Sequence, residues 1–246
     1  MNPHKWNWEF SMLNPGATLL AESYCKVFDG TYTSEQSRDI VRAYLNNEFP
    51  NKFPYGHGGT VLAKVIWEVL SSIHGLYVWS RYVVCGTVVE ELGHQHMLMS
   101  EHINRGAMTT SEIICKGMRT RCHILLCFAC GGQMQDSVDF VKVPKLISIF
   151  IDAQQRINID KNAKLMNKTS RNTILNLWGL IYYADFHFVL WVIDVQGRLW
   201  YSDGWTMGCI STINGTLWAT SNDDILSRGN KMLVAAIYAQ TWITTQ

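Results

Sequence analysis

Apolar residues recur at helical spacing in several stretches of the first 157 residues. The clearest case follows Thr33-Ser34-Glu35-Gln36, a helix-start signature in which Thr33 or Ser34 is the cap. The apolar positions that then share one helical face are Ile40, Val41, Tyr44 and Leu45. The same spacing predicts helices over 60–73 and 85–103, and Pro144 is expected to open another that runs through Ile151.

The pattern changes in the last quarter of the chain. Residues 188–193 are apolar at every position, as in a buried strand at the centre of a sheet. Val195-Gln196-Gly197-Arg198 predicts a turn, and Leu199-Trp200-Tyr201 begins a second strand. Gly-x-Leu-Trp occurs at 197–200 and again at 215–218, which indicates a second hairpin turn. Asp223-Asp224 is expected to cap a final helix that ends near Ala239.

Together these elements predict an α+β fold, with N-terminal helices packed on a C-terminal antiparallel β-meander. The 246 residues fit a single domain, 1–246. Residues 158–173 are polar, rich in Asn and Lys and without periodicity, so they are expected to form an exposed loop. This loop would join a helical lobe, 1–157, to a β-rich lobe, 174–246.

Composition narrows the classes of function. Only 17% of residues are charged, and 21 basic side chains nearly balance 20 acidic ones, which excludes the basic surface typical of nucleic-acid binders. No apolar run is long enough to predict a membrane span, and Met1–Phe10 lacks the apolar core of a signal peptide. Seven cysteines, an odd number, favour reduced thiols in a cytoplasmic compartment. Nothing in the composition indicates the oligomeric state.

The most informative segment runs from His187 to Gly204. His187 opens one predicted strand, Asp203 closes the next, and the turn at Gln196-Gly197 lies about midway between them. Folding this hairpin brings His187 and Asp203 to the same open end. A carboxylate beside an imidazole fixes its tautomer and stabilises its protonated form, as a catalytic base requires.

This segment resembles the His-to-Asp segment of papain-like cysteine peptidases of the bacteriocin-processing, bacterial effector and viral leader types. The resemblance covers residues 187–204. It implies a hydrolase that cleaves a peptide or isopeptide bond of a protein or peptide substrate through a thioester intermediate. His187 would be the general base and acid, and Asp203 would orient it. No cofactor is required for this chemistry.

A papain-like site also needs a cysteine at a helix N-terminus, where the helix dipole stabilises the thiolate. Cys85-Gly86-Thr87 follows an apolar run and precedes a predicted helix, so Cys85 is the predicted nucleophile, with Cys130 and Cys25 as alternatives. No Gln lies between Gln36 and Cys85, where papain-like enzymes place an oxyanion donor. The backbone amide of Cys85 is therefore the expected donor.

Two metal sites are further hypotheses. Cys115, Cys122, Cys127 and Cys130 fall within sixteen residues, and Cys127-Phe-Ala-Cys130-Gly131-Gly132 resembles a zinc-ribbon knuckle, so a structural zinc ion is one expectation. Glu91-Leu-Gly-His94 matches the Glu-x-x-His element of ferritin-like di-metal proteins, although the sequence holds no second copy.

The main alternative to an enzyme is an interaction protein. Four tryptophans lie in the predicted meander, and tryptophan dominates binding hot spots. These are Trp191, Trp200, Trp205 and Trp218. The two hypotheses differ in geometry, because a peptidase needs a cysteine sulfur beside the His187 imidazole.

Overall fold

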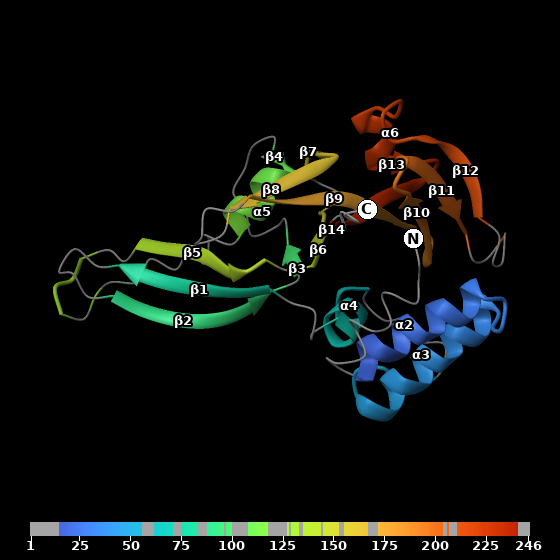
Figure 1. Cartoon of the computed structure of the whole chain (residues 1–246), viewed down its shortest axis with the longest axis horizontal. Coiled ribbons are helices and arrows are strands. Elements are labelled where there is room, and N and C mark those ends of the chain that lie inside the picture. The colour runs from blue at the N-terminus through green and yellow to red at the C-terminus, as the bar shows by residue number, and fades with distance from the viewer. Residues whose placement is uncertain are drawn as a thin grey trace, which may run out of the picture.

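The computed structural model describes residues 15–240, except for 56–61, 71–74, 83–87, 96, 100–107, 118–126, 128, 133–134, 144, 153–154, 167–171, 204–205 and 207–210. The predicted α+β fold class is confirmed. Three helices near the N-terminus, a projecting three-stranded sheet and a nine-stranded sheet are arranged as in Figure 1. None of the described helices is long and apolar enough to cross a membrane.

The N-terminal helices are α2 (Pro15–Phe28), α3 (Ser34–Glu48) and α4 (Leu62–Leu70). The predicted cap of α3 is confirmed: the Thr33 side chain accepts from Gln36 N–H, and the Gln36 side chain accepts from Thr33 N–H. These reciprocal bonds satisfy two amides that have no partner inside the helix. Leu45, Phe53 and Val69 form the small core that joins α3 to α4.

The three-stranded sheet has the order β2-β1-β5 and extends away from the helices (Figure 1). Its strands are β1 (Gly75–Tyr82), β2 (Val88–Gln95) and β5 (Gln135–Lys142). The helix predicted over 85–103 is therefore wrong: this stretch contains β2 and the short β3 (Met97–Met99). Its apolar residues fit helical spacing, but pairing of all eight β2 residues with β1 overrides that local pattern. The di-metal hypothesis fails with it, because Glu91 and His94 belong to a strand and not to the helix the motif needs.

The nine-stranded sheet follows the order β12-β11-β10-β9-β14-β6-β3, with β13 paired to β14 and β8 to β9. Its antiparallel strands are β6 (Leu146–Phe150), β8 (Asn162–Met166), β9 (Asn172–Ala184), β10 (His187–Ile193), β11 (Arg198–Ser202), β12 (Ser211–Thr216), β13 (Ser227–Arg228) and β14 (Lys231–Gln240). β3 joins β6 in parallel. A separate two-stranded sheet pairs β4 (Met108–Thr109) with β7 (Ile157–Asn158).

Three sequence predictions in this sheet are wrong. The helix expected from Pro144 to Ile151 is strand β6, and the helix expected up to Ala239 stops at Leu226 as α6 (Asn222–Leu226), after which the chain forms β13 and β14. The loop expected over 158–173 contains β8, in which Ala163 and Leu165 are buried. The segments of β6 and β14 are apolar on more than one face, so periodicity could not separate a buried strand from a helix. The polar residues around β8 concealed a strand that forms by pairing with β9.

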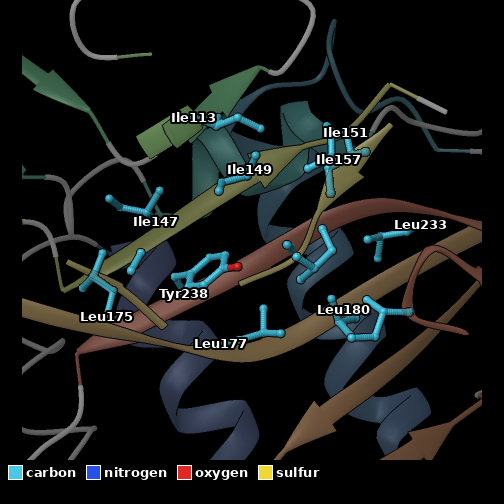
Figure 2. Close-up of a cluster of buried hydrophobic side chains, with 14 of the residues drawn as sticks. Ile113, Ile147, Ile149, Ile151, Ile157, Leu175, Leu177, Leu180, Leu233 and Tyr238 are labelled. Atoms are coloured by element: carbon cyan, nitrogen blue, oxygen red, sulfur yellow. The ribbon is translucent and has the colours of Figure 1, made fainter. Parts of the chain in front are cut away.

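Helices cover both faces of the large sheet. On one face α5 (Thr110–Gly117) contributes Ile113 and Ile114 to the main core, together with Ile147, Leu180 and Tyr238 from the strands (Figure 2). On the other face Ile66 of α4 packs on Phe150 and Ala235. β10, β11 and β12 extend beyond α4 (Figure 1), and they carry the predicted His–Asp hairpin.

Candidate functional site

His187 and Asp203 meet at the open end of the β10–β11 hairpin, as the sequence predicts. His187 Nε2 lies 2.7 Å from Asp203 Oδ1. The Asp203 side chain is only 7% exposed and that of His187 is 23% exposed, so the pair is shielded but reachable. With a carboxylate at Nε2, the imidazole donates its Nε2–H to Asp203, which fixes the tautomer and leaves Nδ1 as the acceptor.

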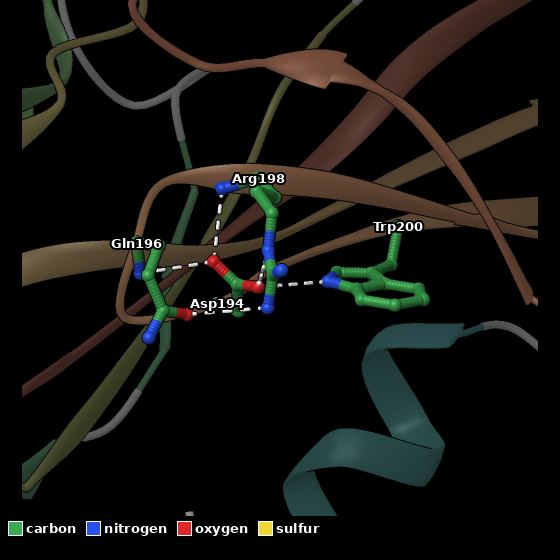
Figure 3. Close-up of polar contacts among 4 residues, drawn as sticks. All are labelled: Asp194, Gln196, Arg198 and Trp200. Carbon is green, nitrogen blue, oxygen red and sulfur yellow. Dashed lines mark hydrogen bonds and ion pairs between the residues drawn. The ribbon is translucent and has the colours of Figure 1, made fainter.

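The register of the hairpin places this pair. Leu190 is opposite Ser202 and Ile193 is opposite Leu199, so the strand positions next to the open end bring residues 187 and 203 together. At the closed end, Asp194 fixes the turn (Figure 3): its Oδ1 accepts from the backbone N–H groups of Gln196 and Arg198, and its Oδ2 from Arg198 Nε and Trp200 Nε1. Burial raises the pKa of Asp194, but these hydrogen bonds outweigh it and hold the pKa at about 2. The carboxylate is thus ionised over the whole physiological range.

Further polar groups surround Asp203. Thr206 N–H donates to Asp203 Oδ1 at 3.3 Å. The pKa of Tyr201 is raised by burial and then by the nearby Asp203 carboxylate, to which its hydroxyl is hydrogen-bonded. The Arg228 guanidinium lies 5.1 Å from the ring centre of Trp191, the residue opposite Tyr201 on β10. The carboxylate is therefore held by three donors, which fixes its orientation toward His187.

The predicted nucleophile, Cys85, lies outside the described residues. It belongs to the connection between Tyr82 and Val88, which are paired at the end of the β1–β2 hairpin. This end is the one farthest from β10 and β11 (Figure 1), and β1 itself is about 26 Å long. The helix predicted to begin at Cys85 is wrong over Val88–Gln95, because these residues form β2.

The alternative thiols are placed as follows. Cys25 is buried in α2, and burial, with Asp29 and Glu22 nearby, raises its pKa. A raised pKa disfavours the thiolate, so Cys25 behaves as a core residue. Cys209 is a further thiol that the sequence patterns do not single out, and it lies outside the described residues. It stands two positions before Ser211, which pairs with Ser202, the neighbour of Asp203 in the chain. Its place in the β11–β12 connection is the signal that could have identified it.

Cys127 and Cys130 form a tight turn before β5. The backbone N–H of Gly131 donates to Cys127 O at 2.8 Å, and the N–H of Ala129 points at Cys127 Sγ at 3.4 Å. Amide donors to a cysteine sulfur are expected where the sulfur carries negative charge, as in a zinc knuckle. Cys115 lies in α5, and Cys122 lies outside the described residues. Among the described residues, no group of three or more His, Cys, Asp or Glu side chains is placed to hold a metal ion.

No family model matches the sequence, and no curated protein matches it either. Solved structures do share the fold. The SAGA Ubp8/Sgf11/Sus1/Sgf73 DUB module bound to ubiquitin aldehyde matches with a TM-score of 0.55 at 9% identity, over 84% of this chain and 54% of that chain. The module bound to monoubiquitin gives 0.55 at 9% identity, over 84% and 53%, and a form of the module with altered Ubp8 and Sgf11 gives 0.58 at 8%, over 90% and 57%. The chain thus spans about half the length of the chains it matches, and at this identity the likeness concerns the fold alone.

Proposed function

We propose that this protein is a cysteine hydrolase that recognises ubiquitin or a ubiquitin-like protein and cleaves a peptide or isopeptide bond at its C-terminus. The observation that carries the proposal is the 2.7 Å contact between His187 and Asp203, in a fold shared with DUB modules bound to ubiquitin. The papain-like character inferred from residues 187–204 is part of the same proposal.

In this mechanism a cysteine thiol gives its proton to His187 Nδ1, because Nε2 is engaged with Asp203. The thiolate attacks the scissile carbonyl, and His187 then protonates the departing amine. Water, deprotonated by His187, hydrolyses the thioester and regenerates the thiol. Asp203 stays ionised throughout and stabilises the imidazolium.

The identity of the nucleophile is the first question for experiment. Cys85 is the prediction from sequence, but the position of Tyr82 and Val88 at the far end of the β1–β2 hairpin argues against it. Cys209 follows Asp203 by six residues and is the further thiol to examine.

The test uses ubiquitin that carries a thiol-reactive group at its C-terminus, with mass spectrometry to locate the modified cysteine. We expect one cysteine of the wild type to be labelled and the labelling to be lost in His187→Ala. Gln196→Ala, in the turn at the other end of the hairpin, is the matched control and should be labelled like the wild type. Equal labelling of wild type and His187→Ala, or none in either, would rule out a histidine-activated thiolate.

A specific observation favours a second candidate, an interaction protein that binds without cleaving. Phe188, Leu190 and Val192 are 39%, 37% and 43% exposed, on the face of β10 opposite the buried Trp191, and Ile213 of β12 is 54% exposed. The exposed apolar surface is thus formed mainly by residues other than the four predicted tryptophans. Trp191 is buried, Trp200 donates to Asp194, Trp205 lies outside the described residues, and Trp218 is 65% exposed. Binding of unmodified ubiquitin without any labelling by the reactive form would support this candidate.

A structural zinc ion is proposed at Cys115, Cys122, Cys127 and Cys130, the four thiols that fall within sixteen residues. The backbone N–H of Ala129, which points at Cys127 Sγ at 3.4 Å, supports a ligand role for Cys127. Purified protein should contain about one zinc per chain by elemental analysis. Cys127→Ser should lose it, whereas Cys25→Ser, at a thiol outside the set, should keep it; loss in both variants, or in neither, would refute this set.

A further inference from the structure

The turn that leads into His187 has an unusual backbone. Ala184 is paired with His187, so Asp185 and Phe186 form a two-residue hairpin turn, with φ of +51° and +61°. Such turns favour Asn-Gly or Asp-Gly, because both central residues have positive φ. Asp185 suits its position, but a bulky residue such as Phe186 is a genuine outlier there.

Elsewhere the sheet meets this requirement with glycine. Gly197 has φ +77° in the β10–β11 turn, and Gly229 has φ +60° in the β13–β14 turn. Phe186 is therefore an exception among neighbouring turns of the same sheet. The strain is held in place by the adjoining turn, where Asn230 Nδ2 donates to Asp185 Oδ2 at 2.8 Å.

Packing does not account for the phenylalanine. Its side chain is 95% exposed, so the ring buries almost no area and adds nothing to the core. Residues on strained backbone cluster at active sites and ligand clamps, so this exposed ring points to a contact outside its own fold.

The Phe186 ring lies at the same end of β10 as the candidate site. Phe186 immediately precedes His187 in the chain, and His187 contacts Asp203 at that end of the hairpin. Phe188, which is opposite Tyr183 on β9, alternates with His187 along β10 and faces the other side of the sheet. A protein bound with its scissile bond at His187 would therefore approach the turn that carries Phe186.

We propose that Phe186 is a substrate-contact residue, which receives an apolar side chain of ubiquitin or a ubiquitin-like protein beside the bond on which His187 acts. The inference rests on the proposed function and names the residue that recognises its substrate. Strain in the free protein is offset by contact in the complex, so stability and binding should respond oppositely to relief of the strain.

The test compares Phe186→Gly and Phe186→Asn, two residues that tolerate positive φ, with Val195→Ser as control. Val195 is also apolar and exposed, at 67%, but lies in the turn at the opposite end of β10. Thermal unfolding of the full chain and titration with ubiquitin, followed by calorimetry, give the two readouts.

We expect Phe186→Gly to unfold at the wild-type temperature or about 2–4 °C above it. Both Phe186 variants should bind ubiquitin about tenfold or more weakly, and Val195→Ser should bind normally. Wild-type affinity in both Phe186 variants, or a loss of thermal stability that accompanies weaker binding, would overturn the assignment while leaving the proposed function intact. If wild-type protein does not bind ubiquitin at all, the proposed function fails, and the assigned substrate contact fails with it.

Discussion

The two ends of the β10–β11 hairpin are built on opposite principles. At the closed end, Asp194 accepts four hydrogen bonds and Gly197 supplies the positive φ that the turn requires. At the open end, a histidine and a carboxylate are held in contact beside a turn in which a phenylalanine has taken the position that favours glycine. Local rules are thus satisfied where the chain only has to turn and violated where we place the reaction, as expected when function competes with stability.

The largest expected effect is a loss of activity that occurs on substitution at the open end of the hairpin and not at the closed end. Asp203→Asn should lower kcat/KM for a ubiquitin-derived fluorogenic substrate by about 10²–10⁴-fold, because the imidazole loses the carboxylate that fixes its tautomer. Its unfolding temperature should change little by comparison. Asp194→Asn, the same substitution at the closed end, should retain activity; comparable losses in both variants would show that the hairpin acts only as scaffold.

Steric crowding at the closed end gives the next largest effect. Gly197→Ala should destabilise the protein by about 1–3 kcal/mol, since φ is +77° and an added Cβ would lie 2.8 Å from Trp218 Nε1. Urea denaturation measures this change. Gly229→Ala has positive φ but no atom within 4 Å of the added Cβ, so it isolates the backbone contribution and should cost less.

The smallest effect is electrostatic and depends on pH. Because the pKa of Asp194 is lowered from 3.8 to about 2 in the folded protein, its stabilisation is complete above pH 4 and is lost as the pH falls through 2. Asp194→Asn should therefore cost about 1 kcal/mol at pH 6 after allowance for the exposed Arg198, and almost nothing near pH 2. Denaturation curves at pH 6, 3 and 2 would show it; a difference that is constant across this range would contradict the role of the ionised carboxylate.

The same contrast explains what could be predicted from the sequence. The His187–Asp203 pair and the Thr33 cap were predictable because a hairpin turn and a capping box are local signals. β14 was mistaken for helix because its Ala-rich sequence has helical propensity, and only pairing with β9 on one side and β6 on the other makes it a strand. The partner thiol of His187 depends on which distant segments meet, and chain spacing near Cys85 carries no information about that.

The strain at Phe186 and the network around Tyr201 were missed for a related reason. Asp185 and Phe186 look like ordinary loop residues until the Ala184–His187 pair shows that only two residues make the turn. Likewise Arg228 and Tyr201 are separated along the chain, and strand order brings Arg228 to Trp191, the residue opposite Tyr201.

The position of β14 has a consequence for synthesis of the protein. This strand lies between β9 and β6 but follows both in chain order, so each leaves the ribosome with one edge unpaired. At ordinary translation rates the gap between emergence of β9 and of β14 is about 3–11 s. For that interval the apolar residues Leu180 and Ile149, both fully buried in the final fold, have no partner strand on that side. The nascent chain therefore exposes an incomplete sheet with unpaired, aggregation-prone edges, and we expect it to depend on chaperones until β14 is made.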